Sequence, residues 1–433
     1  MRMSSQSILS GLFRRVLAVR EFLRKTLKRA AHRHPWLVNQ VKALDDRLAL
    51  TYLSLTVPKA RLLLVDPALP AGVNAIGYMT GEFSLAESAR ALVTALQAAE
   101  IPYVINSIRN DFRFQRDKND LALADNNPYR FNLVHFNPQE TSVVYSHKGW
   151  NYFKDRYNIG VWYWELPKFP ALWAPDFNLY HEIWVTSPFC EEAIKAASPV
   201  PVTRIVHPII IDDTVIKRDR APFGLPADRF LFFFAFDFIS RAERKNPLAL
   251  VQAFRRAFAH DPNAMLVLKC VNARLFPEEM RRLEVAAEGL NVHFMDALLS
   301  RAGMLSLTAS CDCYISLHRA EGLGLGMAES MYLGLPVIAT GYSGNLDFMT
   351  ADNSFLVDYQ LVETQPEFGY FAKGNVWAEP SVEHAAELMR QVYTDREHAA
   401  AIGARAATAI RTRMTPQVTG EQIRARLAEI SNK

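Results

Sequence analysis

Short apolar runs rich in β-branched and aromatic residues alternate with longer helical patterns along most of the chain. Such alternation predicts βα units and parallel sheets, because the helix of each unit returns the chain across the sheet. The first set of predicted strands is Asn74–Met79, Tyr103–Ser107, Leu133–Phe136, Ile159–Trp164, Ile183–Thr186 and Thr203–Val206. The second set is Leu231–Phe236, Met265–Val271, Val292–Met295, Cys313–Leu317, Pro336–Thr340 and Phe355–Val357. We therefore expect two doubly wound α/β domains, with ligands bound beyond the carboxyl ends of the strands in a cleft between the domains.

The length of 433 residues allows two domains with full cores, and the strand pattern lapses between its two sets. Prolines and mixed charge occupy this gap at Pro208–Pro226, which is the best candidate for a linker. The final helical segment is a candidate to pack back on the N-terminal domain. The predicted organisation is a basic helical arm with its lead-in at 1–70, an N-terminal domain at 71–207, a linker at 208–228, a C-terminal domain at 229–413 and a final helix at 414–433.

The charge of the chain is unevenly distributed. Residues 1–60 hold 12 of the 49 Lys and Arg but only 3 of the 45 Asp and Glu, so a basic arm precedes a slightly acidic body. From Ile8 to Ala31 the arm has the periodicity of an amphipathic helix with one basic face. Such a helix either lies on an anionic membrane surface or packs on the body with its charges in solvent. We expect no nucleic-acid partner, because the arm lacks a reading motif and the rest of the chain is acidic.

Other features of the composition are typical of a globular cytoplasmic protein. No stretch offers about 20 apolar residues, and the apolar start of the arm ends at Arg14 and Arg15, short of a signal-peptide core. The four cysteines are too few for a disulfide framework and lack metal-ligand spacing, so we expect reduced, mostly buried thiols. The expected location is the cytoplasm, with the arm as a candidate contact to the inner face of the membrane.

The most informative segment runs from His318 to Glu329, between a predicted buried strand and a helix. Glycines at positions 322, 324 and 326 let the backbone approach a ligand closely, and the start of the following helix favours a diphosphate through its amides and dipole. The spacing Gly-x-Gly-x-Gly departs from the nicotinamide-binding pattern Gly-x-Gly-x-x-Gly. Glu321 precedes the glycines, and Glu329 follows eight positions later on the predicted helix.

This Glu-x7-Glu arrangement resembles the hallmark of the retaining glycosyltransferases of family 4, of the type that builds bacterial polysaccharides. The segments Gly334–Thr340 and Gly341–Asn345 resemble the continuation of the family pattern. The resemblance covers about residues 72–413. It implies a GT-B fold, in which two Rossmann-like domains face each other across a cleft, the N-terminal one presenting the acceptor and the C-terminal one binding a nucleotide diphosphate sugar.

The resemblance also implies roles for single residues. Glu321 would contact the donor sugar, Glu329 would hold the ribose hydroxyls, and the loop of Gly322, Leu323 and Gly324 would bind the diphosphate. Transfer would need no cofactor or metal beyond the donor itself, and the chain contains no Asp-x-Asp sequence that would bind a metal–diphosphate pair. The alternative to these roles is that the two glutamates are solvent-exposed and that the glycines form a turn with a purely structural role.

A second segment, Phe236–Pro247, joins the first strand of the C-terminal domain to its helix. Transfer from a nucleotide sugar leaves negative charge on the departing diphosphate, so fixed cations lower the barrier. Lys245 resembles the phosphate-binding lysine of the family. Many members carry an arginine five or six positions earlier, where this chain has isoleucine and serine at 239 and 240. Arg241 or Arg244 is a candidate replacement, and the alternative is that both are solvated helix-start residues.

The N-terminal domain carries weaker signals. His135 follows an apolar strand and resembles the histidine that reaches the donor sugar from the opposing domain, although a lone histidine in this position is commonly structural. Gly81 lies in a loop after the first strand that matches the family's phosphate and acceptor loop in part. Trp164 and Trp184 either stack on a sugar acceptor or belong to the core.

The expected function is therefore hexosyl transfer, with retention, from GDP-mannose or a UDP-hexose to a glycan acceptor in cell-surface polysaccharide synthesis. The expected acceptor class is a polyprenyl-diphosphate-linked oligosaccharide. His135, Lys245 and Glu321 are the predicted catalytic residues. Gly81, Arg244, Gly322, Leu323, Gly324 and Glu329 are predicted to bind the donor. The alternatives are a nucleotide-sugar epimerase on the same fold and a non-catalytic sensor or scaffold at the membrane. Release of nucleoside diphosphate separates the transferase from the sensor.

Overall fold

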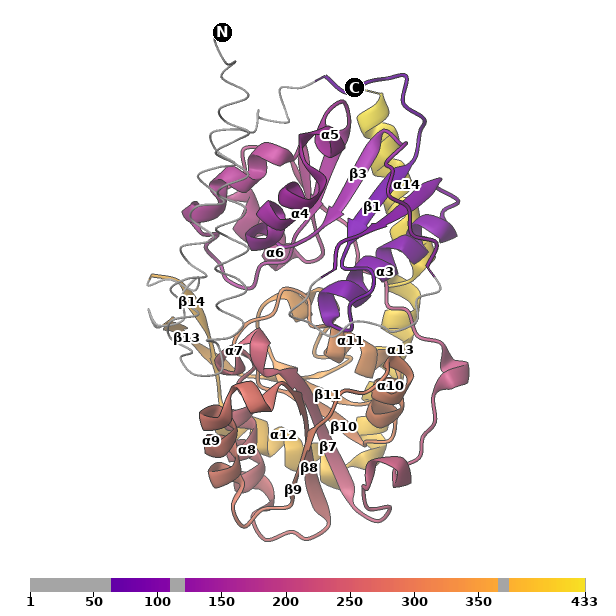
Figure 1. The fold of residues 1–433 in the computed structure, drawn as a ribbon. Coiled ribbons are helices and arrows are strands. Elements are labelled where there is room, and N and C mark those ends of the chain that lie inside the picture. The colour runs from indigo at the N-terminus through magenta and orange to yellow at the C-terminus, as the bar shows by residue number, and fades with distance from the viewer. Residues whose placement is uncertain (1–63, 110–120, 365–373, 433) are drawn as a thin grey trace.

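The computed structural model describes residues 64–109, 121–364 and 374–432. The predicted basic helix at Ile8–Ala31 lies outside the described residues. The described residues form two α/β domains, one above the other in Figure 1. Each domain contains a six-stranded parallel sheet with helices on its faces, which confirms the expected GT-B architecture.

The N-terminal sheet has the strand order β2-β1-β3-β4-β5-β6. Its strands are β1 (Val73–Gly77), β2 (Tyr103–Ser107), β3 (Phe131–His135), β4 (Tyr157–Val161), β5 (Glu182–Val185) and β6 (Val202–Arg204), and its principal helices are α3 (Ser84–Ala98), α4 (Thr141–Lys148), α5 (Trp150–Phe153) and α6 (Pro188–Lys195). The strands β1, β3 and β5 are buried along their whole length because helices cover both faces of the sheet. The order of the strands reverses between β1 and β3, so the loops after Gly77 and His135 begin at a topological switch point, where ligands bind in open α/β sheets.

The C-terminal sheet has the order β12-β11-β10-β7-β8-β9. Its strands are β7 (Phe230–Asp237), β8 (Ala264–Val271), β9 (Val292–Asp296), β10 (Cys313–Ser316), β11 (Val337–Thr340) and β12 (Phe355–Val357). Its helices are α7 (Ala242–Lys245), α8 (Pro247–Phe258), α9 (Pro277–Ala287), α10 (Arg301–Ala309), α11 (Leu325–Tyr332), α12 (Val382–Thr394) and α13 (Arg396–Arg413). β7 and β10 are adjacent at the switch point of this sheet, so the loops that follow them lie side by side.

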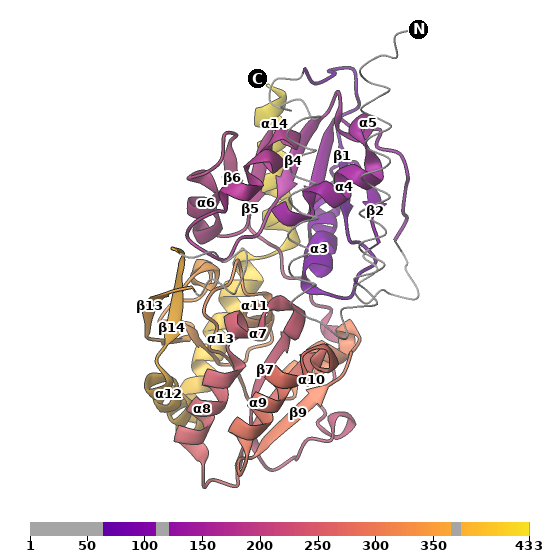
Figure 2. The same ribbon diagram turned by 60° about the vertical axis from the view of Figure 1, so that its left-hand side comes forward.

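All twelve predicted strands occur within a few residues of their expected positions. An antiparallel hairpin of β13 (Tyr359–Glu363) and β14 (Val376–Pro380) was not predicted. It lies at the edge of the C-terminal domain in Figure 2 and contacts the N-terminal domain. There the side-chain amide of Asn375 donates to the carbonyl of Lys168 (2.9 Å), and the Lys168 ammonium donates to the carbonyl of Gly374 (2.6 Å).

Helix α14 (Pro416–Ser431) crosses back and packs along α3, as both ribbon views show. Ile423 and Leu427 complete the apolar core between α3 and the N-terminal sheet. Arg426 forms two hydrogen bonds, of 2.9 and 2.8 Å, with the buried carboxylate of Glu182 in β5. A Cβ atom at Gly420 would lie 2.4 Å from the carbonyl oxygen of Ala95, so the close approach of the two helices requires glycine.

Aromatic residues of the N-terminal domain form its core. Trp164 and Trp184 are 3% and 1% exposed, so both belong to the core and neither offers a ring face for an acceptor. Trp164 packs edge-on against Trp173, with ring centroids 5.2 Å apart. All four cysteines are buried and free, as expected, and burial raises the pKa of the Cys190 thiol to about 11.

Candidate active site

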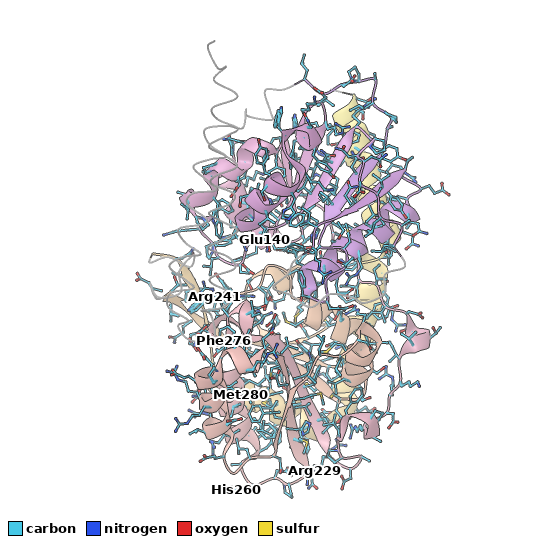
Figure 3. The ribbon with its side chains drawn as sticks, in the orientation of Figure 1. Glu140, Arg229, Arg241, His260, Phe276 and Met280 are labelled. Carbon is cyan, nitrogen blue, oxygen red and sulfur yellow. The ribbon has the colours of Figure 1, made fainter. Side chains whose placement is uncertain are left out.

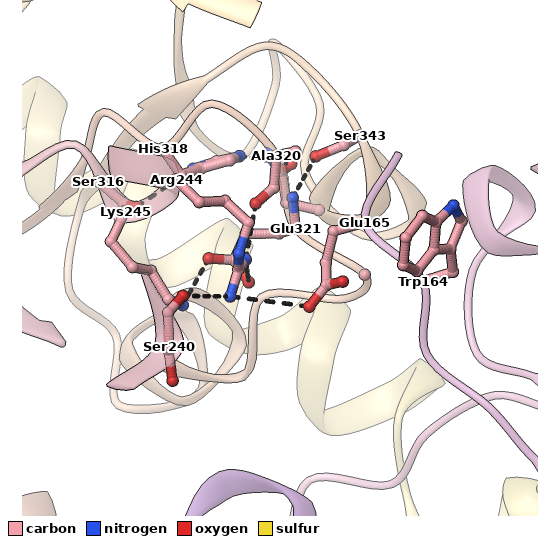
Figure 4. Close-up of polar contacts among 12 residues, drawn as sticks. Trp164, Glu165, Ser240, Arg244, Lys245, Ser316, His318, Ala320, Glu321 and Ser343 are labelled. Atoms are coloured by element: carbon pink, nitrogen blue, oxygen red, sulfur yellow. Dashed lines mark hydrogen bonds and ion pairs between the residues drawn. The ribbon is translucent and has the colours of Figure 1, made fainter. Parts of the chain in front are cut away.

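Two charged loops meet at the switch point of the C-terminal sheet. Lys245 ends α7 after β7, and Glu321 follows β10 by five residues. The Lys245 ammonium lies 2.5 Å from Oε1 of Glu321, and Nη1 of Arg244 lies 3.1 Å from Oε2 of the same carboxylate (Figure 4). The structure thus brings together three of the residues predicted from the sequence. We call these three residues the Glu321 cluster.

The Glu321 carboxylate is ionised although it is buried. Burial disfavours the charged form, but the nearby Lys245 and Arg244 outweigh this effect and lower the pKa of Glu321 to about 2. At neutral pH the carboxylate therefore acts as a fixed acceptor and a fixed negative charge. It is suited to accept a hydrogen bond from a hydroxyl group and is too weak a base to remove a proton from one.

Arg244 is occupied by the protein itself. In addition to Glu321, its guanidinium donates to the carbonyls of Ala320 (2.8 Å) and Ser240 (3.3 Å), and only 6% of the residue is exposed. Its Nη2 atom lies 3.7 Å from Oε1 of Glu165, which belongs to the loop after β4 in the opposite domain. Arg244 therefore orients Glu321 and joins the two domains at this point, and its predicted contact with the donor stays a prediction.

Backbone conformation fixes the direction of α7. Arg241 precedes the helix with φ of 66°, and Asn246 follows it with φ of 53°, both in a region that residues other than glycine rarely adopt. Non-glycine residues in this region cost about 1–3 kcal/mol each and cluster at functional sites. Arg241 lies on the edge of the C-terminal domain that faces Glu140 of the N-terminal domain in Figure 3.

A second layer supports the backbone of Glu321. Its amide donates to Oγ of Ser343 (2.9 Å), and its carbonyl accepts from the amide of Gly344 (2.9 Å). A Cβ atom at Gly344 would lie 2.1 Å from the carbonyl oxygen of Gly322, so this contact between the two loops requires glycine. His318 is buried beneath the cluster, bonded to Ser316 (3.1 Å), and burial lowers its pKa. Sequence reasoning noted this Ser-Gly pair as part of a family pattern, without its supporting role.

The glycine-rich loop joins the Glu321 cluster to α11. Gly324 precedes the helix with φ of 96°, a conformation that glycine adopts without strain. The carbonyl of Gly322 accepts from Oγ of Ser187 in the N-terminal domain (2.7 Å), and Leu323 is buried in the core. The first amides of a helix have no intrahelical partner, so the start of α11 presents donors and a positive dipole end beside this loop.

A cavity of about 250 Å³ lies between the two domains, next to the segment that connects them. We call it the hinge cavity. It is lined from α3 by Glu87, Arg90, Ala91 and Thr94, from the connecting segment by His207, Pro208, Ile209, Ile210, Asp212 and Val215, and from the C-terminal domain by Arg301, Leu305, Leu325 and Glu329. Glu329 therefore faces this cavity from α11, and its Oε1 lies 2.6 Å from Nη2 of Arg301. Burial raises the pKa of Glu329, against the opposing effect of Arg301.

His135 and Gly81 do not line the hinge cavity themselves but are linked by hydrogen bonds to residues that do. Nε2 of His135 bonds Oγ of Ser88 on α3 (2.9 Å), and the same hydroxyl bonds Nε2 of the cavity residue His207 (2.8 Å). Burial lowers the pKa of His135 to about 4, so its ring is neutral at physiological pH. The carbonyl of Gly81 accepts from the cavity residue Arg90 (2.9 Å). Neither residue contacts the Glu321 cluster, so the nine predicted site residues divide between that cluster with its loop and the surroundings of the hinge cavity.

Two site residues were not among those predicted from the sequence. Glu165 follows Trp164 directly, and only the tryptophan of that pair was considered from the sequence. Arg301 is the first residue of α10 and belongs to no sequence motif.

Within the described residues, no group of three or more His, Cys, Asp or Glu side chains is arranged to hold a metal ion. None of the described helices combines the length and the apolar character needed to cross a membrane.

Comparison with known proteins supports the fold. Residues 216–409 match the family model described as glycosyl transferases group 1. No curated protein matches the chain in sequence. Among solved structures, HepE of Anabaena, in complex with UDP and glucose, is 14% identical with a TM-score of 0.58, over 83% of this chain and 100% of that one. Sucrose-phosphate synthase of Thermosynechococcus elongatus is 15% identical with a TM-score of 0.60, over 83% and 99%. A glycosyltransferase of Rickettsia africae is 11% identical with a TM-score of 0.57, over 83% and 97%. Residues 216–409, which carry the Glu321 cluster and Glu329, therefore match the group 1 glycosyltransferase model within a chain of GT-B architecture.

Proposed function

We propose that this glycosyltransferase is a retaining enzyme of family 4 that moves a hexose from a nucleotide diphosphate sugar to a glycan acceptor. The observation that carries the proposal is the Glu321 cluster, placed beside the glycine-rich loop and the N-terminus of α11 where the two domains meet. A buried carboxylate held by two cations, next to a set of backbone donors, fits a sugar attached to a diphosphate. The sugar offers hydroxyls to the carboxylate, and the diphosphate offers charge to the donors.

The chemistry follows from the charge that develops during transfer. Breaking the bond between the sugar and the diphosphate leaves negative charge on the diphosphate, which Lys245 and the first amides of α11 would stabilise. Glu321 would hold the sugar through its hydroxyls. The attacking hydroxyl would lose its proton to the departing phosphate, which is consistent with a site whose buried carboxylate has a pKa of about 2 and cannot serve as the base.

The remaining predicted residues act on the other parts of the donor. Glu329, in the hinge cavity, would accept the ribose hydroxyls. His135 would reach the sugar from the N-terminal domain after a rearrangement that releases its ring from Ser88, because the bond between them holds the ring in place. We propose a UDP-hexose or GDP-mannose as donor. The UDP and glucose in the HepE structure make UDP-glucose the first donor to test.

We propose a polyprenyl-diphosphate-linked glycan as acceptor and polysaccharide synthesis at the inner face of the membrane as the setting. The support is the basic composition of residues 1–60, which suits an anionic surface where such acceptors reside. Binding of the purified protein to vesicles with and without anionic lipid tests this setting. Binding that is equal for both vesicle types would contradict an electrostatic role of the arm.

The test of the function is release of nucleoside diphosphate from a panel of UDP- and GDP-hexoses, with and without a lipid-linked acceptor. Acceptor-dependent release from one donor, and an unchanged anomeric configuration in the product by NMR, are the expected results. Lys245→Ala should reduce release by about 100- to 1,000-fold, the usual cost of one stabilising group. Lys195→Ala is the matched control, because that lysine is 70% exposed on α6. Donor binding without release would support a sensor, and inversion would refute the family 4 assignment.

A further inference from the structure

The hinge cavity contains one ion pair that none of the roles above explains. Arg301 begins α10 and directs Nη2 to Oε1 of Glu329, at 2.6 Å. The same nitrogen lies 3.4 Å from the carbonyl oxygen of Ile210, in the segment that connects the domains. Both side chains of the pair line the cavity and are largely buried, with 26% and 16% of their surfaces exposed. The pair is thus formed across two helices at the point where the domains are joined.

The arginine uses one oxygen of the carboxylate and leaves the other for a ligand. Within the described part of the chain, no hydrogen bond to Oε2 of Glu329 is found, and Glu329 faces the cavity. A carboxylate fixed by an arginine on one oxygen presents the second oxygen in a defined direction, because the planar guanidinium restricts rotation of its partner. A hydroxyl donor that enters the cavity therefore meets an acceptor that is already oriented.

We propose that Arg301 is a positioning residue for the nucleotide: it holds one oxygen of Glu329 so that the other accepts a ribose hydroxyl in the hinge cavity. The inference rests on the proposed nucleotide-sugar donor and adds the residue that makes Glu329 an effective ribose acceptor. Without Arg301, Glu329 would be a buried carboxylate without its cation. Such a group takes up a proton or turns toward solvent, and in either form it is a poorer acceptor for a hydroxyl.

The experiment compares a ribonucleotide with its 2′-deoxy counterpart. Dissociation constants for UDP and 2′-deoxy-UDP, and for GDP and 2′-deoxy-GDP, are measured by calorimetry on the full chain. A hydrogen bond to a charged acceptor contributes enough to favour the ribonucleotide by about 10- to 100-fold in the wild type. Arg301→Gln should reduce this ratio to near one, chiefly by weakening binding of the ribonucleotide. Arg301→Lys should restore part of the ratio, since an ammonium group can still contact Oε1.

A matched control separates positioning from folding. Arg218 also lies between the connecting segment and the helices of the cavity, where it donates to the carbonyls of Ala309 (3.1 Å) and Leu333 (3.0 Å). Arg218→Gln should lower thermal stability and leave the ratio of the two dissociation constants unchanged. A ratio that survives Arg301→Gln would overturn the proposal and leave the donor assignment standing. A wild type that binds the ribo and deoxy forms equally would overturn both the role of Glu329 and the proposal, and absence of any nucleotide binding would overturn the proposed function as well.

Discussion

Replacing Glu321 by glutamine tests the electrostatics of the candidate site in a way that needs no substrate. Lys245 and Arg244 hold the pKa of this carboxyl at about 2 against its ordinary value of 4.5, although burial acts in the opposite direction. Each unit of pKa corresponds to about 1.4 kcal/mol, so ionisation of Glu321 adds about 3 kcal/mol to the free energy of unfolding at pH 7. Because the side chain is only 10% exposed, solvent screening reduces this figure little. Glu321→Gln should therefore cost about 3 kcal/mol at pH 7.

The pH dependence has a defined sign. A carboxyl group whose pKa is lower in the folded than in the unfolded state stabilises the fold above the unfolded pKa, and this contribution disappears as the pH falls toward the folded pKa. The difference in stability between the wild type and Glu321→Gln should thus begin to shrink near pH 5. It should fall to about half by pH 3 and be nearly gone at pH 2.

The assay is urea denaturation of both proteins at pH 7, 5, 4 and 3, followed by tryptophan fluorescence, with the difference in unfolding free energy taken from the midpoints. Glu284→Gln, at an exposed position of α9, serves as the control for loss of one charge and should differ from the wild type by less than about 0.5 kcal/mol. A difference between the wild type and Glu321→Gln that is near zero at pH 7, or that does not change between pH 7 and pH 3, would refute the reasoning.

Three further predictions concern single contacts. Lys245→Ala should abolish most sugar transfer and should also lower the free energy of unfolding, because Glu321 loses one of its two cations. A thermal-shift measurement should show this loss of stability together with the loss of turnover. Unchanged stability would contradict the 2.5 Å contact between Lys245 and Glu321. Gly344→Ala should destabilise the fold by about 1–3 kcal/mol, because the added Cβ atom would lie 2.1 Å from the carbonyl oxygen of Gly322. Gly322→Ala is the control: the nearest atom to its added Cβ lies 3.4 Å away, so this variant should fold with a nearly unchanged melting temperature. Arg426→Ala leaves the carboxylate of Glu182 buried without its cation and should cost about 3–5 kcal/mol in urea denaturation, a result that a loss below about 1 kcal/mol would contradict.

Sequence periodicity predicted the regular part of the fold because buried parallel strands are continuous apolar runs. The five phenylalanines of β7 and the apolar β8 are examples. The hairpin of β13 and β14 escaped prediction because β13 is largely exposed and therefore lacks such a run. Its contacts with the N-terminal domain depend on Asn375 and Lys168, which have no pattern in common.

The site residues could be predicted where they lie within one segment of the sequence that resembles a family motif. The glycine-rich loop and the two glutamates lie within one segment, and Lys245 was identified from the segment after β7. The contact between Lys245 and Glu321 joins residues 76 positions apart, and it exists because β7 and β10 are neighbours in the sheet. Glu165 and Arg301 reach their partners through the relative placement of the domains and of two helices, which no pattern within a single segment encodes.

The return of α14 to the N-terminal domain bears on how the protein is made. One layer of that domain is supplied by Ile423 and Leu427, so the N-terminal sheet lacks this cover until almost all of the described chain has been synthesised. The C-terminal domain, whose strands and helices are contiguous in sequence, can fold while that layer is still missing. The domain that is translated first is therefore the one that is completed last, and a chain truncated just before position 416 would carry a complete C-terminal domain beside an N-terminal domain with an exposed apolar face.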